Sequence, residues 1–313
     1  MQKGTEVCEG IFERSVPFRV NENMKINNEW KDYQIYATGD GEKLERWKNI
    51  VLLRPDPQAI WHAAKPLHTV VKPHARYIRS SSGGGHWEYD AKIPESWNVS
   101  WRNLTFCVRP MNFKHTGLFP EQAANWATMI DLISKARRPI KVLNLFAYTG
   151  GATVACLSAG ASVCHVDAAK NMVEVAKQNV ALSGLFDRPV RYIVDDCRKF
   201  VKREINRGHT YDAIIMDPPS FGRGAGGEEW KLERDICDFL QLCMNVLSDN
   251  PLFVLLNSYT TGLQPAVLYD LLLRTVPCEG NITSYEVCLP TDEKTVLPCG
   301  ASGLFTAKGV ENE

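Results

Sequence analysis

The sequence predicts an α/β fold in which a doubly wound, mostly parallel sheet follows a smaller β-rich unit. The first observation is an apolar run at 140–146 that ends in a glycine turn and passes straight into a helix of small residues at 152–159. The second is that apolar runs and helical patterns alternate from there onwards, which is typical of parallel strands with helices on both faces. The third is that the apolar runs before residue 114 are short and separated by turn residues.

Residues 1–113 form the predicted β-rich N-terminal domain. Residues 1 to about 28 have no clear period, so we expect an arm or a strand at a sheet edge. Aromatic or β-branched runs predict the first strands of this domain, at 33–36, 49–53 and 75–78. The serine–glycine run at 80–85 predicts a loop tip, and 101–109 is expected to be a further strand.

Six of the eight tryptophans lie in this domain: Trp30, Trp47, Trp61, Trp87, Trp97 and Trp101. In a small domain with few aliphatic residues, aromatic side chains often supply the core. Interleaved with basic residues, they can also form a surface on which nucleic-acid bases stack. The sequence leaves both interpretations open.

The elements after residue 114 alternate in type. A helical pattern covers 121–136, and Pro120 and Glu121 suit its first turn. The other predicted helices cover 170–182, 197–206, 228–247 and 265–274. The strands expected among them cover 162–166, 191–194, 211–216 and 252–257. Two final strands, at 284–289 and 303–306, are expected to form a closing hairpin.

Composition places the chain among soluble globular proteins. Its 313 residues are 44% hydrophobic and 23% charged, and no apolar run approaches the length of a membrane-spanning helix. No basic segment followed by an apolar one begins the chain, so we expect a cytoplasmic protein without a membrane partner. The ten cysteines form no C-x-x-C pair, which argues against a metal site and favours a reducing compartment.

The charge distribution is uneven although the net charge is zero. Residues 54–115 hold nine Lys or Arg against four Asp or Glu, and five of the seven histidines. This stretch is either an ordinary polar surface or a face that contacts phosphates.

Two features of the first βαβ unit predict a nucleoside-containing cofactor. The turn at 147–151 leads into a helix N-terminus, which presents backbone N–H groups to a ligand. Asp167 ends the second apolar run, where a carboxylate can accept hydrogen bonds from a ribose diol.

Four motifs in order carry a resemblance to a known family. They are FAYTGG at 146–151, Asp167, the pair Asp195–Asp196, and DPPSF at 217–221. Together they resemble class I S-adenosylmethionine-dependent methyltransferases, above all the branch similar to bacterial large-subunit ribosomal RNA methyltransferases that act on cytosine C5 or guanine N7. The segment 115–126 resembles the lead-in of that branch. The resemblance covers 114–305 and implies a seven-stranded, Rossmann-like methyltransferase domain at 114–313, with S-adenosylmethionine as cofactor.

The resemblance also implies which residues contact the cofactor. The turn would pack against the methionine part, Asp167 would bind the ribose, and Asp195 or Asp196 would reach the adenine amino group. Asp167 and the Asp195–Asp196 pair have an alternative role as helix caps. The full expected set is Phe119, Gln122, Phe146, Ala147, Tyr148, Thr149, Gly150, Asp167, Ala168, Asp195, Asp196, Cys197 and Asp217.

The methyl acceptor is expected at Asp217, Pro218, Pro219 and Phe221. Two prolines make a rigid turn, and the carbonyl between them can accept a hydrogen bond from a planar amine or ring N–H. Phe221 could stack on a base. The glycine-rich run at 222–227 predicts a mobile loop, and Trp230 is expected to start the next helix.

Cytosine C5 methylation requires a cysteine thiolate, and the position expected for it reads Asn257–Ser258–Tyr259. Cys197 and Cys299 are the candidate substitutes, each with a structural alternative. The predicted function is methyl transfer to a base in structured RNA, with ribosomal RNA as the expected partner. A methyltransferase acting on a protein side chain or a small molecule, and a noncatalytic RNA-binding protein, are the alternatives. The sequence predicts no particular oligomeric state.

Overall fold

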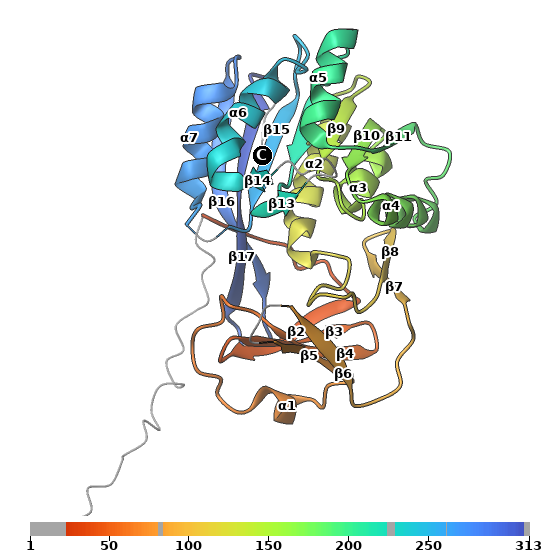
Figure 1. The fold of residues 1–313 in the computed structure, drawn as a ribbon, viewed down its shortest axis with the longest axis vertical. Coiled ribbons are helices and arrows are strands. Elements are labelled where there is room, and N and C mark those ends of the chain that lie inside the picture. Colours follow the sequence, from red (N-terminus) through yellow and green to blue (C-terminus); the bar gives the residue numbers. More distant parts are fainter. Residues whose placement is uncertain (1–22, 81–83, 224–228, 261, 310–313) are drawn as a thin grey trace, which may run out of the picture.

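The computed structural model describes residues 23–80, 84–223, 229–260 and 262–309. Parts of two expected loops, at 80–85 and 222–227, lie outside the described residues. Figure 1 shows an upper lobe built on one large sheet with helices on both sides, and a lower lobe built on a smaller sheet.

The large sheet confirms the doubly wound prediction. It has eight strands in the order β1-β16-β17-β15-β12-β9-β10-β11. Strands β9, β10, β11, β12 and β15 pair in parallel, and β17 pairs antiparallel with both β15 and β16. Their bounds are β1 Met24–Ile26, β9 Lys141–Leu145, β10 Ser162–Asp167, β11 Val190–Val194, β12 Ala213–Met216, β15 Phe253–Ser258, β16 Gly280–Pro290 and β17 Val296–Ala307. Seven of these strands make the expected methyltransferase sheet, and β1 adds an eighth at its edge.

Three helices cover each face of this sheet. One face carries α2 Ala123–Lys135, α3 Gly151–Ser158 and α4 Lys170–Leu182, and the other carries α5 Cys197–Arg207, α6 Leu232–Met244 and α7 Pro265–Thr275. Each set encloses its own apolar core, one around Trp126 and Val142 and the other around Phe239 and Val254. The sheet strands are therefore buried on both sides, which explains their continuous apolar runs.

The lower lobe is the β-rich unit expected at the N-terminal end. Its five-stranded sheet has the order β2-β3-β4-β5-β6. The strands are β2 Tyr33–Gly39, β3 Glu42–Trp47, β4 Ile50–Pro55, β5 Ala75–Arg79 and β6 Gly85–Tyr89, with the short helix α1 Leu67–Val70 beside them. Strands β3 and β6 are not predicted from the sequence, because both carry charged residues that hide the alternation.

Three segments tie the lower lobe to the upper one. The edge strand β1 pairs with β16 of the large sheet. The hairpin of β7 Trp97–Trp101 and β8 Leu104–Val108 packs on α4, where the backbone N–H of Cys107 donates to the Asn179 side chain at 2.8 Å. The long hairpin β16–β17 reaches down to β2 (Figure 1), and Ile35 bridges to Thr291.

Two expected elements differ from the structure. The strand expected at 101–109 is β8, but it begins later, at Leu104, because Arg102 takes a positive φ of 50° and turns the chain between β7 and β8. The helix at 228–247 begins later, at Leu232, because residues before it form the two-stranded hairpin of β13 Phe221–Arg223 and β14 Glu229–Lys231. Trp230 therefore lies in a strand.

Most tryptophans of the N-terminal segment belong to cores. Trp47 and Trp101 are fully buried, and Trp126 packs on Trp101 with ring centroids 5.5 Å apart. Trp61 is the exposed member of the set, at 37%. The core interpretation therefore holds for the fully buried tryptophans, Trp47 and Trp101.

In the part of the chain that the structure describes, no helix is both long and apolar enough to cross a membrane.

Candidate active site

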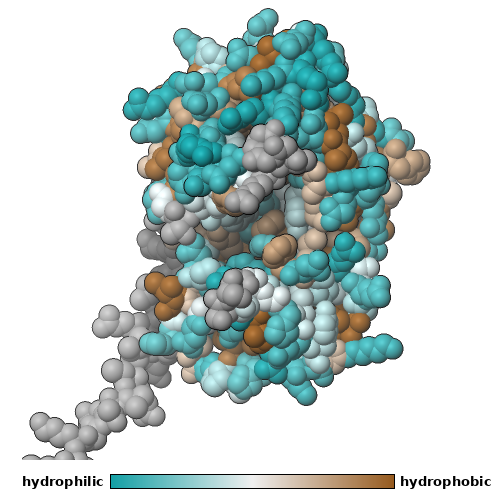
Figure 2. Space-filling model, in the orientation of Figure 1, coloured by the Kyte–Doolittle hydropathy of each residue, from teal (hydrophilic) through white to brown (hydrophobic). Residues whose placement is uncertain are grey.

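The carboxyl ends of β9, β10 and β12 meet at one deep cleft between the two lobes. The cleft has a volume of about 1140 Å³, and Tyr148, Asp167 and Pro218 all line it. Figure 2 shows the surface hollowed at this level, with hydrophobic residues inside the hollow. Ligand sites of open α/β sheets lie in this position, outside the carboxyl ends of the strands.

The turn after β9 is held in an unusual backbone conformation. Phe146 and Tyr148 have φ values of 54° and 49°, in the left-handed region that residues other than glycine rarely adopt. Such conformations cost roughly 1–3 kcal/mol each and persist where surrounding contacts fix them. Phe146 and Tyr148 line the cleft, whereas Ala147 and Thr149 line a small chamber of about 50 Å³ beside it.

The two glycines of this turn serve the packing of helices. A Cβ atom on Gly150 would lie 2.8 Å from the Cβ of Ala176 on α4, and one on Gly151 would lie 2.5 Å from the ring of Trp126 on α2. Gly150 also needs its positive φ of 82°. The missing side chains therefore allow close contact between α2, α3 and α4.

Asp167 is fixed in the cleft by two backbone donors. Its Oδ2 accepts from the Tyr148 N–H and its Oδ1 from the Ala169 N–H, both at 2.8 Å. Burial raises the pKa of the carboxyl, and these hydrogen bonds counter part of the rise. Each oxygen keeps a second lone pair, so the carboxylate can still accept two hydroxyl donors from a ligand.

The neighbouring acidic pair divides into two different environments. Asp196 caps α5 through a 2.9 Å hydrogen bond from the Lys199 N–H, and it also lines the cleft. Asp195 pairs with Arg203 and is not among the lining residues. Cys197 lines the cleft but is buried, and its Sγ accepts from the Phe146 N–H at 3.3 Å. The structure thus brings Asp196 and Cys197 to the expected site, together with Ala168, and leaves Asp195 outside.

The Asp217–Pro218–Pro219 turn forms the opposite wall. The indole Nε1 of Trp230 donates to the Pro219 carbonyl at 2.7 Å, which ties the turn to β14. Pro218, Pro219 and Trp230 all line the cleft. Phe221 lies one strand further on, is 51% exposed, and is not among the lining residues.

Asp217 is the most strongly perturbed acid of this wall. Burial, together with the nearby negative charge of Glu121, raises the pKa of Asp217 to about 7. Burial also raises the pKa of Glu121, and Lys43 and the Tyr259 hydroxyl counter part of that rise. The cleft therefore holds two carboxyl groups that repel each other when both are ionised.

Phe119 and Gln122 lie where the resemblance implies. Phe119 lines the cleft, and its ring centroid lies 5.7 Å from that of Tyr148 and 5.4 Å from that of Tyr259. Gln122 lines the small chamber together with Asp217 and donates to the Tyr259 hydroxyl at 2.7 Å.

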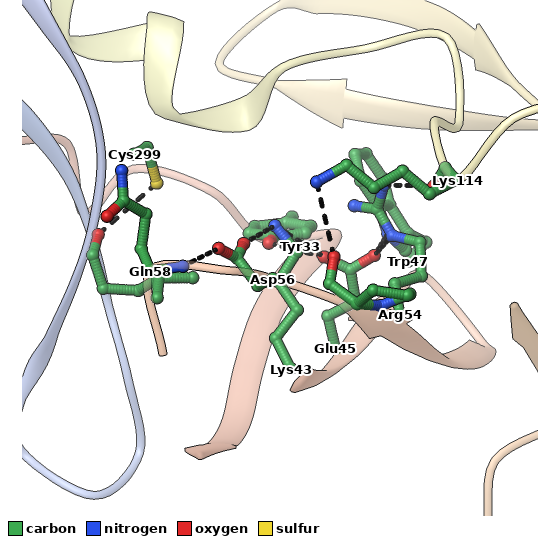
Figure 3. Close-up of polar contacts among 11 residues, drawn as sticks. Tyr33, Lys43, Glu45, Trp47, Arg54, Asp56, Gln58, Lys114 and Cys299 are labelled. Atoms are coloured by element: carbon green, nitrogen blue, oxygen red, sulfur yellow. Dashed lines mark hydrogen bonds and ion pairs between the residues drawn. The ribbon is translucent and has the colours of Figure 1, made fainter. Parts of the chain in front are cut away.

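The lower lobe supplies the floor of the cleft. Lys43 and Arg54 of this lobe line the cleft together with Lys114, and each of the three is anchored by the protein (Figure 3). Arg54 Nε lies 2.5 Å from Glu45 Oε1, and Lys43 Nζ lies 3.1 Å from Asp56 Oδ2. Burial lowers the pKa of Lys114 to about 8, because desolvation and the neighbouring cations disfavour its charged form.

Several residues that line the cleft are not predicted from the sequence to belong to one site. They are Lys43, Arg54, Lys114, Glu121, Trp230 and Tyr259. Of these, Glu121 and Trp230 are predicted from sequence only as residues at helix starts. Pairing of β3 and β4 in the lower lobe brings Lys43 and Arg54 together, and no local pattern reveals that this sheet faces DPPSF.

Comparison with known proteins agrees with the geometry. A family model described as S-adenosylmethionine-dependent methyltransferase matches residues 41–279. A solved S-adenosylmethionine-dependent methyltransferase from Agrobacterium tumefaciens is 34% identical, with a TM-score of 0.86, over 91% of this chain and 93% of that one.

Curated relatives match over shorter stretches. Ribosomal RNA large subunit methyltransferase K/L of Shewanella frigidimarina is 34% identical over 147 residues, which are 46% of this chain and 20% of that protein. Ribosomal RNA large subunit methyltransferase I of Cronobacter sakazakii is 34% identical over 131 residues, 42% of this chain and 32% of that protein. The matched stretches span a third or less of the length of these relatives.

Proposed function

The chain belongs to the S-adenosylmethionine-dependent methyltransferases, and from this premise we propose that it methylates a base in structured RNA, with ribosomal RNA as the substrate. The observation that carries this proposal is the single cleft in which Asp167, Asp217 and the floor residue Arg54 meet. It has room for a nucleoside cofactor and a second planar group. The names of the curated relatives support RNA as the acceptor.

The cofactor half of the cleft would lie over β9 and β10. S-adenosylmethionine supplies a methyl group already activated on sulfonium, so the chain needs only to bind, orient and manage a proton. Asp167 would accept the ribose hydroxyls with its remaining lone pairs. Asp196 would face the adenine. The other proposed contacts are Phe119, Gln122, Phe146, Ala147, Tyr148, Thr149, Ala168 and Cys197.

The acceptor half would lie between the DPPSF turn and the floor of the lower lobe. Lys43, Arg54 and Lys114 border it below, and α5 adds basic residues on the other side, including Arg198 and Lys202. Basic side chains at such an opening can contact phosphates of an RNA strand while a base enters the cleft. We therefore propose substrate recognition for the N-terminal domain, residues 1–113, and catalysis for residues 114–313.

The cysteine chemistry argues for a heteroatom acceptor. The Asn257 side chain accepts hydrogen bonds from Asn125 at 3.2 Å and Ser302 at 2.8 Å, so it has a structural role. Burial raises the pKa of the Cys197 and Cys299 thiols, which keeps both protonated and weakly nucleophilic. Among the described residues that line the cleft, neither cysteine supplies a thiolate for addition to a pyrimidine ring, and we propose methylation at a nitrogen or oxygen of the base.

A second candidate is methylation of a protein side chain or a small molecule. It is favoured by the near balance of acidic and basic residues on the cleft and by the zero net charge of the chain. Neither feature attracts a polyanion over long distances.

The experiment offers both substrate classes at once. Purified protein and S-adenosylmethionine labelled in the methyl group are incubated with ribosomal RNA from a strain that lacks the protein, and separately with RNase-treated lysate. We expect label in RNA, located to one base by mass mapping. Label confined to protein or to small molecules would overturn the RNA proposal and favour the second candidate.

A further inference from the structure

Glu121 is a buried carboxylate in the cleft that has no cationic side chain as an ion-pair partner among the described residues. It lies in the short helix η1, Pro120–Gln122, is 6% exposed, and lines the cleft with Asp217. A buried carboxylate is costly unless something compensates its charge.

Other buried acids of this fold have cationic partners. Glu45 pairs with Arg54, and Glu204 pairs with Arg191 and Arg207. Among the described residues, neither Glu121 nor Asp217 has a Lys, Arg or His within ion-pair distance. Lys43 is the cation that most offsets the charge of Glu121, and its Nζ lies against Asp56 at 3.1 Å.

A hydrogen-bond network fixes Glu121 from behind. The Gln122 Oε1 accepts from Asn125 at 2.8 Å and from Asn257 at 3.3 Å, which orients the Gln122 amide. The Gln122 Nε2 then donates to the Tyr259 hydroxyl oxygen at 2.7 Å. The hydroxyl hydrogen of Tyr259 is left to point at another acceptor, and the Glu121 carboxylate faces it. Tyr259 is thus a positioning residue for Glu121.

We propose that Glu121 and Asp217 form a carboxylate pair that binds the methyl acceptor through a nitrogen carrying hydrogen and takes up the proton that this nitrogen loses. In the transfer, a bond forms between the acceptor nitrogen and the methyl carbon while the bond from that carbon to sulfur breaks. The sulfonium becomes a neutral thioether, and the N–H proton passes to the ionised carboxylate of the pair. This inference rests on the proposed function and specifies the class of acceptor atom.

The charges around the pair define its pH behaviour. The charge of Asp217 interacts with those of Glu121 and Tyr259, and the charge of Glu121 interacts with Lys43, Arg54 and Tyr259, and also with Cys299 and Tyr33. Burial and the charge of Glu121 raise the pKa of Asp217 to about 7. The pair therefore gains its proton-accepting form as pH rises through neutrality, and removing the charge of Glu121 moves that transition to lower pH.

The test compares wild type with Glu121→Gln, using Glu174→Gln on the exposed face of α4 as control. Calorimetric binding of S-adenosylhomocysteine reports folding and the cofactor site, and we expect affinities within threefold for all three proteins. Transfer to ribosomal RNA should fall about 10²-fold in Glu121→Gln, in the range that acid–base groups contribute. The low-pH limb of its rate profile should shift to lower pH.

A second measurement needs no acceptor. Infrared difference spectra of the carboxyl groups should show one group titrating near pH 7 in wild type and at lower pH in Glu121→Gln. Unchanged spectra and unchanged rates, with cofactor binding intact, would overturn the pair. Absence of transfer to RNA by the wild type would instead contradict the proposed function, and the spectra would still decide on the pair.

Discussion

The backbone N–H of Tyr148 donates to the Asp167 carboxylate at 2.8 Å, which joins the turn after β9 to the end of β10. The same carboxylate accepts from the Ala169 N–H before α4. One acidic side chain therefore connects the first two strands of the cofactor side and still has lone pairs that face the cleft. Replacing Asp167 should therefore change both the conformation of the turn and the binding of a ligand.

Asp167→Asn should bind S-adenosylhomocysteine about 10- to 100-fold more weakly. The amide can accept at one atom only, and a hydrogen bond to a charged group contributes roughly 1.5–3 kcal/mol, where 1.4 kcal/mol is a factor of ten. Isothermal titration calorimetry measures the change. Asp195→Asn is the control, because Asp195 pairs with Arg203 and does not line the cleft. Equal weakening in both variants would mean that Asp167 acts through folding alone.

Trp230→Phe should keep cofactor binding and slow transfer about fivefold. The change removes the 2.7 Å hydrogen bond from Nε1 to the Pro219 carbonyl, worth about 1 kcal/mol, and keeps a ring against Phe146. Rates under saturating cofactor measure it. Trp61→Phe is the matched control, because its Nε1 donates to the Thr38 carbonyl in the lower lobe. A loss of cofactor binding in Trp230→Phe would contradict a role confined to the acceptor turn.

The positions of the strand ends could be predicted from the sequence, because local patterns encode them. Continuous apolar runs ending at Asp167 and Asp217 located the strand ends, and parallel pairing then brings those ends to one edge. Asp196 could not be separated from Asp195 by pattern, since only the geometry at the start of α5 decides which side chain caps the helix and which pairs with Arg203.

The floor of the cleft escaped prediction for a different reason. Lys43 and Arg54 come from β3 and β4, and their partners Glu45 and Asp56 become visible only when that sheet has formed. From sequence, Glu121 is predicted only as a residue of a helix start. Its contact with Tyr259 involves a segment 138 positions further along the chain, and no local pattern around position 121 indicates that contact. A site formed by segments that are distant in the sequence gives no periodic pattern from which it could be predicted.

Gly151→Ala should lower the thermal unfolding temperature by about 3–10 °C. The added methyl would lie 2.5 Å from the Trp126 ring, which is itself wedged against Trp101 and Phe106. Overpacking of this kind costs roughly 1–3 kcal/mol, and each kcal/mol shifts the midpoint by about 2–4 °C in chains of 150–250 residues. Circular dichroism follows the transition.

Gly222→Ala is the control for this change, because its Cβ would make an ordinary 3.7 Å contact with Pro219. A drop of equal size in Gly222→Ala would show that the loss comes from glycine replacement in general, contrary to the packing argument.

Tyr211→Phe should destabilise the protein at neutral pH and much less in acid. Glu204 is fully buried, which by itself would raise its pKa, but hydrogen bonds with Tyr211, Arg207 and His209 lower the pKa to about 2. The Tyr211 hydroxyl donates to Glu204 Oε2 at 2.6 Å. A folded-state pKa below the unfolded value of about 4.3 stabilises the fold above that pH, and this contribution disappears as pH falls towards 2.

Without the Tyr211 hydroxyl the pKa of Glu204 rises, so the free energy of unfolding should fall most above pH 5, by roughly 1.5–3 kcal/mol. The gap between wild type and Tyr211→Phe should then narrow steadily from pH 5 to pH 2, because the Tyr211 hydroxyl gains less by donating to a neutral Glu204 carboxyl group than to a charged carboxylate. Urea unfolding at a series of pH values measures the gap, with Tyr269→Phe on the exposed face of α7 as control. A gap that stays constant with pH would mean that Tyr211 stabilises the fold through packing alone.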